Sequence, residues 1–239
     1  MRRRIEFQPG FVLAQRAYRE TSVLLEVFSQ SEGRVGLVAR GARGPRSKQR
    51  GLVQAFVPLL LSWTESGELG TLVAAEAAGP AIPLQGERIF HGWYLNELLT
   101  RLLQRHDPHP ALYAAYERAL QELVAADDEP ALRSFELSLL AELGYGLDLD
   151  GDIDTHASYG YDFDRGLVAV AAGTSGALRG ATLLALREDR LGDCDVSMKR
   201  EARHLLRSAI HRHLGGRELE TPQLLRALRA KIGVSPRTE

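Results

Sequence analysis

The segment RGARGPRSKQRG, at residues 40–51, combines cations with glycines and contains no acid. Its positive side chains are Arg40, Arg43, Arg46, Lys48 and Arg50. Guanidinium and ammonium groups neutralise phosphates, and glycines let the backbone approach a phosphate chain closely. The alternative is a solvated charged turn, but charge runs on ordinary surfaces usually mix both signs. The composition therefore favours a contact with nucleic acid.

An acidic run, DLDGDID, has a composition that could bind a cation. Its carboxylates belong to Asp148, Asp150, Asp152 and Asp154. A calcium loop of the EF-hand type requires Gly at its sixth position and Glu at its twelfth. Counting from Asp148, those positions hold Ile153 and Tyr159. We therefore interpret the run as a solvated acidic loop, and a magnesium-dependent nuclease site is the alternative.

The histidines and the cysteine are too scattered to complete a metal site. His211 and His213 lie two residues apart, so on a helix they face different ways. A single cysteine, Cys194, cannot form a zinc site built on two or more thiolates. The sequence also contains no serine-hydrolase elbow, P-loop or zinc-protease motif. We expect no catalytic site, no cofactor and no bound metal.

The N-terminal third has the pattern of short strands. Its apolar segments are FVLAQRAY, SVLLEVF, RVGLVAR, LVQAFVPLLLSW and GTLVAAE. In the third segment, Val35, Leu37 and Ala39 alternate with Arg34, Gly36, Val38 and Arg40, which is the period of a half-buried strand. Arg34 is a further candidate DNA contact beside the basic segment. About five short strands in such a length indicate a small closed barrel, for which the OB-fold is the common solution. Residues 1–79 are therefore predicted to form an OB-fold domain, with the basic segment between the third and fourth strands.

Residues 80–239 are predicted to form a mostly helical domain, which makes the fold class α+β. Helical periodicity begins in ERIFHGWYLNELLTRLL and returns in later segments on both sides of residues 146–178. Residues 146–178 themselves show little periodicity and are predicted to form a loop or irregular β excursion. The segment SMKREARHLLRSAIHRHL has an apolar stripe opposite a cationic face. That face carries Lys199, Arg200, Arg203, Arg207 and Arg212. It is a second candidate DNA contact, and a solvated helix face is the alternative.

The charge distribution agrees with a polyanionic partner. The chain of 239 residues has a net charge of −1, but residues 1–50 carry eleven cations against four acids. Such asymmetry suggests a polyanion bound near one end. A protein–protein adaptor with an incidental basic segment is a further alternative. The single cysteine and the lack of a long apolar run are typical of a cytoplasmic protein.

The chain resembles the RecO family of recombination mediators. The resemblance lies in YRETSVLLEVFSQSEGRVGLVARGAR, LVQAFVPLLLSW, GELGTLVAAEA and YLNELL, and in the helical half in EPALRSFELSLLAELGYG and HLGGRELETPQLL. It implies an OB-fold joined to a helical domain, binding of single- and double-stranded DNA without catalysis, and annealing of complementary strands. It further implies cooperation with RecR in loading RecA onto DNA coated by the single-strand-binding protein SSB, near the nucleoid. OB-folds often add aromatic stacking to a basic groove, for which Tyr18 and Phe28 are candidates, although Phe28 suits the core at least as well.

Two further expectations follow from the resemblance. Many relatives have a four-cysteine zinc module where this chain has DLDGDIDTHASYGYDFDRG, so this hairpin should hold itself by packing alone. The family also implies docking of the acidic SSB tail, which ends in an apolar residue. The candidate receptor residues are Leu112, Tyr116, Leu132 and Arg133. The three apolar residues could equally be plain core, with Arg133 a solvated helix-end residue.

Overall fold

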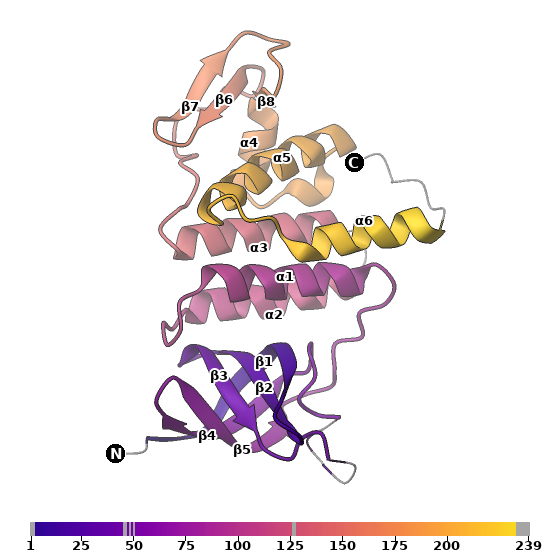
Figure 1. Ribbon diagram of the computed structural model, residues 1–239. Helices are drawn as coiled ribbons and strands as arrows, with labels where there is room; N and C mark the ends of the chain where they lie inside the picture. The colour runs from indigo at the N-terminus through magenta and orange to yellow at the C-terminus, as the bar shows by residue number, and fades with distance from the viewer. Residues whose placement is uncertain (1–2, 45–46, 48, 50, 126–127, 233–239) are drawn as a thin grey trace. The chain divides into compact units, whose positions relative to one another are not determined.

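The computed structural model describes residues 3–44, 47, 49, 51–125 and 128–232. The chain divides into two compact units, residues 1–124 and residues 125–239 (Figure 1). The boundary predicted at residue 79 marks the change from strands to helices, and as a boundary between independently folding domains it stays a prediction.

The strands of the first unit close into a barrel. They are β1 (Arg4–Tyr18), β2 (Ser22–Ser29), β3 (Gly33–Ala39), β4 (Leu59–Ser66) and β5 (Leu69–Ala77). Their order around the barrel is β1-β2-β3-β5-β4, and β3 pairs with β5 in parallel while the other neighbours are antiparallel. This closed five-stranded, OB-like barrel, followed by a helical region, confirms the predicted α+β class.

Strict alternation along β3 explains why this segment closes the barrel. Val35, Leu37 and Ala39 are buried in the barrel core, while the residues between them face outward. Trp63 on β4 is fully buried in the same core. Because each strand places every second side chain inside, the interior fills with side chains and the strand edges pair with one another.

The segment before β4 differs from the prediction. The sequence predicts a strand from Leu52, but β4 begins at Leu59. Residues 51–58 instead form turns, in which Phe56 has a positive φ of 64°. Val53 is buried in the barrel core, so the apolar residues of this segment fill one end of the barrel instead of extending its wall.

Two helices complete the first unit, α1 (Arg88–Leu102) and α2 (Pro110–Ala125). Asn96 of α1 is 3% exposed and links three elements. Its amide nitrogen donates to the Leu13 carbonyl of β1 at 2.9 Å, and its amide oxygen accepts from the Tyr116 hydroxyl of α2 at 2.6 Å. The Tyr116 ring also packs edge-on against Phe11, so the helices are fixed to β1 by both polar and apolar contacts.

The second unit is mostly helical and has a small sheet at one end (Figure 1). Its elements are α3 (Asp128–Glu142), β6 (Ser158–Asp162), β7 (Gly166–Val170), β8 (Leu178–Arg179), α4 (Gly180–Arg187), the 3-10 helix η1 (Leu191–Asp193), α5 (Val196–His213) and α6 (Glu220–Ile232). The sheet order is β7-β6-β8. The excursion at 146–178 therefore contains a regular antiparallel hairpin, because β6 and β7 pair in register from Ser158 to Asp162.

Tyrosine hydroxyls fasten the acidic segment to this hairpin. The Tyr161 hydroxyl accepts from the backbone N–H of Asp148 at 2.9 Å, and the Tyr159 hydroxyl accepts from that of Asp154 at 2.9 Å. Arg212 of α5 is bound to Asp164 at the hairpin turn, at 2.8 Å. Hydrogen bonds and an ion pair thus hold the hairpin, so the expectation that it holds itself by packing alone is wrong.

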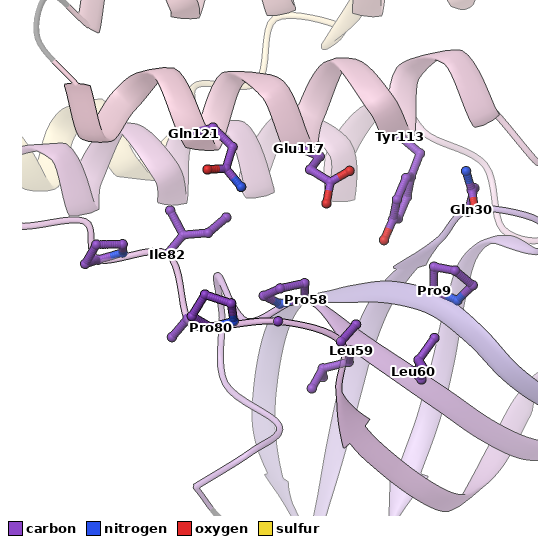
Figure 2. Close-up of a pocket in the computed structure, with 14 residues that line it drawn as sticks. Pro9, Gln30, Pro58, Leu59, Leu60, Pro80, Ile82, Tyr113, Glu117 and Gln121 are labelled. Carbon is purple, nitrogen blue, oxygen red and sulfur yellow. The ribbon is translucent and has the colours of Figure 1, made fainter.

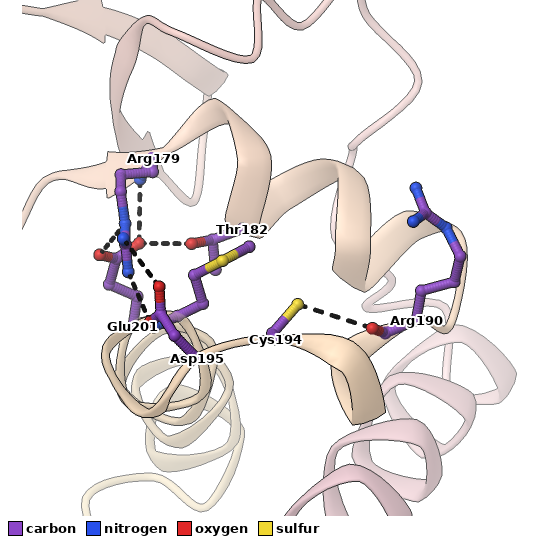
Figure 3. A network of polar contacts seen from close by, with 7 residues as sticks. Arg179, Thr182, Arg190, Cys194, Asp195 and Glu201 are labelled. Atoms are coloured by element: carbon purple, nitrogen blue, oxygen red, sulfur yellow. Dashed lines mark hydrogen bonds and ion pairs between the residues drawn. The ribbon is translucent and has the colours of Figure 1, made fainter.

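A polar network connects β8 and α4 to the start of α5 (Figure 3). Glu201 accepts from the Arg179 side chain at 2.7 Å and from the Thr182 hydroxyl at 2.6 Å. Asp195 caps α5 by accepting from the Met198 N–H at 2.7 Å. Its carboxylate also accepts from the Arg179 guanidinium. The Met198 N–H, followed by Arg179, lowers the pKa of Asp195 below its ordinary value.

Removing the Asn96 amide should destabilise the first unit. Asn96→Ala leaves the Leu13 carbonyl and the Tyr116 hydroxyl without their partner in a dry interior, so we expect a loss of about 3 kcal/mol in the free energy of unfolding. Urea unfolding followed by tryptophan fluorescence measures it, because both tryptophans, Trp63 and Trp93, belong to this unit.

Tyr116→Phe and Tyr113→Phe are the matched pair for this experiment. The first removes the hydroxyl that donates to Asn96 and should cost about 1–2 kcal/mol. The second removes a hydroxyl for which no hydrogen bond to a described residue is found, and should change stability by less than about 0.5 kcal/mol. Equal losses in the two variants would show that the Asn96 bridge contributes nothing.

Candidate nucleic-acid interface

The outer face of β1 and β2 leads toward the basic segment. In the antiparallel register Arg16 pairs with Leu24, and Tyr18 pairs with Ser22 at the hairpin tip. Leu24 in turn pairs with Val38 of β3. Because side chains in one register row share a face, Arg16 and Tyr18 project from the same side of the barrel as Val38.

Arg40 and Arg43 follow the end of β3 beside this hairpin tip. The Arg43 backbone N–H donates to the Thr21 carbonyl at 2.9 Å, and its guanidinium reaches the Arg19 carbonyl at 3.5 Å. Arg40 is exposed and forms no ion pair with a residue that the structure describes. The structure thus brings two of the predicted cations to the β1–β2 turn.

Buried side chains hold both ends of the basic segment. Ala42 and Val53 are part of the barrel core, at 2% and 1% exposure. Gly41 lies between the end of β3 and Ala42 and has a positive φ of 68°. Such a φ favours glycine at the point where the chain leaves the strand. Three of the predicted cations, Arg46, Lys48 and Arg50, lie outside the described residues, but the segment that carries them starts and ends at fixed points of the barrel.

Two arginines at this end of the barrel are missing from the sequence-based candidates. Arg16 is exposed on β1, and the Arg19 guanidinium lies 5.2 Å from the centre of the Tyr18 ring. Period-two alternation identifies Arg16, because it lies two residues before Tyr18 on one strand face. Arg19 shows no such sequence signal, because its position depends on the turn that follows β1.

Tyr18 is half-buried, whereas Phe28 is fully buried against the rings of Tyr113 and Tyr116.

Arg34 lies on β3 in a different environment from Arg40. Its guanidinium is 3.4 Å from the Glu26 carboxylate, which also binds Arg105. Burial lowers the pKa of Arg34, while Glu26 opposes this shift and Arg105 adds to it. A Cβ atom at Gly36 would meet the Arg105 guanidinium at 2.3 Å, so this part of the outer face is occupied by protein. Arg34 therefore has a structural partner that Arg40 lacks.

Helix α5 separates its cations into two roles. Arg203 binds Glu129 of α3 through two hydrogen bonds of 2.9 and 2.8 Å, and Arg212 binds Asp164. Arg200 and Arg207 are exposed and have no ion pair within the described part of the chain. Lys199 lies next to Arg200 and is half-buried.

The exposed edge of α5 contains histidines as well as arginines. Arg200, His204, Arg207 and His211 follow one another at helical spacing and are all exposed. The sequence-based candidates include only the arginines of this edge. A continuous row of such side chains suits a phosphate backbone, because two of its members carry fixed positive charge.

The four residues proposed for an acidic tail are all buried. Leu112 and Tyr116 belong to the first unit, and Leu132 and Arg133 belong to α3 in the second. Arg133 is 4% exposed, and its guanidinium binds the fully buried carboxylate of Glu136 at 2.8 Å and approaches Glu129 at 3.4 Å. The arginine thus already has carboxylate partners within its own helix.

The acidic run and the cysteine show structural roles. Asp148 accepts from the Asp150 N–H and Asp154 accepts from the His156 N–H, so two of the carboxylates cap local turns. Within the described residues no group of three or more potential metal ligands is found. The Cys194 thiol contacts the Arg190 carbonyl, and burial and then the flanking acids raise its pKa, against the effect of Lys199. In the part of the chain that the structure describes, no helix is long and apolar enough to span a bilayer.

Comparisons with known proteins identify the family. Residues 1–81 match the family model of the recombination protein O N-terminal domain, and residues 83–222 match that of its C-terminal domain. The chain is 46% identical to the DNA repair protein RecO of Methylococcus capsulatus over 94% of both chains. It is 44% identical to RecO of Aromatoleum aromaticum, over 95% of this chain and 98% of the relative, and 44% identical to RecO of Nitrosospira multiformis, over 94% and 96%. Both halves of the chain and nearly its whole length therefore agree, and the chain belongs to the RecO family of recombination and DNA repair proteins.

Proposed function

We propose that this chain binds single- and double-stranded DNA without reading its sequence and anneals complementary strands. The observation that carries the proposal is the gathering of four arginines around the β1–β2 turn. They are Arg16, Arg19, Arg40 and Arg43. Glu20 is the acid of the turn itself, so the four arginines leave the local charge positive.

Annealing follows from the type of contact. Arginines neutralise phosphates and hold a strand in place, but they leave base edges free when they bind only the backbone. Two strands held this way repel each other less and can pair. Tyr18 offers a ring for base stacking, which tolerates any sequence. The α5 edge of Arg200 and Arg207 is the proposed second contact, for the other strand or for the duplex that forms.

The partners are part of the same proposal. Together with RecR, the protein is proposed to help load RecA onto DNA coated with SSB, and the acidic SSB tail would recruit it. DNA as the ligand implies a cytoplasmic, nucleoid-associated protein. We propose no catalytic step, and Lys199 and Arg203 are weaker candidates for DNA contacts than Arg200 because both are partly buried.

Replacing Arg40 and Arg43 should reduce both DNA affinity and its salt dependence. Each lost phosphate contact lowers the slope of log affinity against log salt by about 0.7 for single strands, so Arg40→Ala with Arg43→Ala should lower it by about 1.4. Fluorescence anisotropy of a labelled oligothymidine at several salt concentrations measures this slope. Arg118→Ala, an exposed arginine of α2, is the control and should leave it unchanged. A double variant with the wild-type slope would remove this surface from the DNA path.

The α5 edge should affect annealing more than capture of a single strand. Arg200→Ala with Arg207→Ala should slow annealing of complementary strands several-fold at low salt, because the second strand loses its positive surface. Oligothymidine affinity should change less than in the barrel variant. Arg165→Ala, an exposed arginine at the β6–β7 turn, is the control. Unchanged annealing in the double variant would contradict the second contact.

The SSB-tail proposal requires an experiment that preserves the fold. Arg133→Glu would place a third carboxylate beside Glu129 and Glu136, so loss of tail binding could not be separated from unfolding. Arg133→Met with Glu136→Leu removes the buried pair together, which apolar residues of similar volume tolerate. Because Arg133 is 4% exposed and already binds Glu136, we expect the affinity for a labelled acidic tail peptide, measured by anisotropy, to change by less than about twofold in this variant. Wild-type affinity in this folded variant would exclude Arg133 as the tail receptor, and a loss of at least about tenfold would support it.

A further inference from the structure

A cavity of about 450 Å³ lies within the first unit, between α2 and the start of β4. Its apolar wall comes from the barrel and from the segment that follows β5, and includes Pro58, Leu60, Pro80 and Ile82. Its other wall is one edge of α2. Figure 2 shows three side chains of this helix directed toward the prolines. The cavity contains no residue of the arginine cluster at the β1–β2 turn.

The α2 wall carries polar side chains without a hydrogen bond or ion pair to a residue that the structure describes. Tyr113, Glu117 and Gln121 are spaced four residues apart, so they lie along one side of the helix. Tyr113 is 5% exposed, its ring packs against Phe11 and Phe28, and its hydroxyl forms no hydrogen bond with a described residue. Among the described residues, Glu117 and Gln121 also have no hydrogen bond or ion pair through their side chains. Glu117 and Gln121 are exposed and line the cavity together with Tyr113, so their polar groups can reach a ligand there.

The charge of the cavity lining favours a cationic ligand over an anionic one. Glu117 is the one charged residue of its lining, and the remaining polar side chains there are neutral. Burial and the nearby Glu117 carboxylate raise the pKa of Tyr113, so the phenol remains a neutral hydroxyl that can donate or accept. A phosphate or an acidic peptide would be repelled by Glu117, whereas a guanidinium could bind the carboxylate and the hydroxyl together.

The dimensions of the cavity favour a polypeptide over a free small molecule. From Tyr113 to Gln121 the helix rises by about 12 Å, at about 1.5 Å per residue. Three to four residues of extended chain cover the same length, at about 3.3 Å each. Prolines and aliphatic side chains on the opposite wall provide a rigid apolar surface for the neighbours of the basic residue.

We propose that this cavity binds an extended segment of a partner protein in which an arginine is flanked by apolar residues. The arginine would bind Glu117 and the Tyr113 hydroxyl, and its neighbours would pack on Pro58, Pro80 and Ile82. Gln121 would bind the peptide backbone. This site is separate from the proposed DNA contacts and is opposite to them in charge.

The test uses the full-length protein and a defined probe, the blocked pentapeptide acetyl-ALRLA-amide. In ¹H–¹⁵N NMR titrations the side-chain amide signals of Gln30 and Gln121, which line the cavity, should shift with probe concentration. Glu117→Gln should lower the affinity for the probe at least about tenfold, because a charge-assisted bond is lost without a change of shape. Tyr113→Phe should lower the affinity for the probe several-fold. Wild-type affinity in Glu117→Gln would overturn the proposal.

Three controls make the result specific. Glu122→Gln removes an exposed carboxylate of the same helix that lies outside the cavity, and it should bind the probe like wild type. The same peptide with citrulline in place of arginine should bind at least about tenfold more weakly, because the charge is absent. Free arginine should bind far more weakly than the pentapeptide. Equal binding of citrulline peptide, or of free arginine, would refute recognition of a cationic polypeptide. Oligothymidine affinity should be unchanged in Glu117→Gln, so the outcome is independent of the proposed DNA binding.

Discussion

The first unit depends on a buried amide that connects two helices to a closed barrel. Asn96 binds the carbonyl of Leu13 and the hydroxyl of Tyr116, and the rings of Phe11 and Phe28 pack against α2 around this point. A buried amide requires defined partners, so it fixes the position of both helices more tightly than apolar packing does. Since α2 carries Tyr113 and Glu117, the same bond positions the cavity wall. It also fixes α1 to β1 at Leu13, and the arginine cluster begins further along the same strand, at Arg16.

Some arginines of this chain bind carboxylates within the protein, and others are exposed to a possible ligand. The two groups differ in burial and in whether a carboxylate lies within reach. Arg34, Arg133 and Arg203 bind carboxylates in partly or fully buried positions. Arg40 and Arg200 are exposed, with no ion pair to a described residue. An arginine that is already desolvated and paired gains little from a phosphate, because it would have to break one charge-assisted bond to form another. Only the exposed set can respond strongly to a polyanion.

The sequence predicts the architecture well because its signals are local. Alternation along Val35–Ala39, helical periodicity in the 88–102 segment and the acids in the first turn of α3 each identify an element within a few residues. The roles of individual cations depend on partners distant in sequence. Glu129 lies 74 residues before Arg203, and Arg105 reaches Glu26 across 79 residues. No local pattern contains that information, so Arg34 and Arg203 cannot be separated from Arg40 and Arg200 by sequence alone. The Arg19–Tyr18 contact and the cavity are equally non-local in origin.

The β6–β7 hairpin illustrates how a chain with a single cysteine can keep this part of the fold ordered. A structural zinc site joins four side chains from separated segments at one point. Here the Tyr159 and Tyr161 hydroxyls bind backbone groups of the acidic segment, and Arg212 joins the turn to α5 through Asp164 while its guanidinium lies 5.7 Å from the Phe163 ring centre. Each bond is weaker than a metal–ligand bond, but together they connect the same kinds of separated segments. The carboxylates of Asp148 and Asp154 therefore accept from local backbone N–H groups, and the carboxylate of Asp164 binds Arg212.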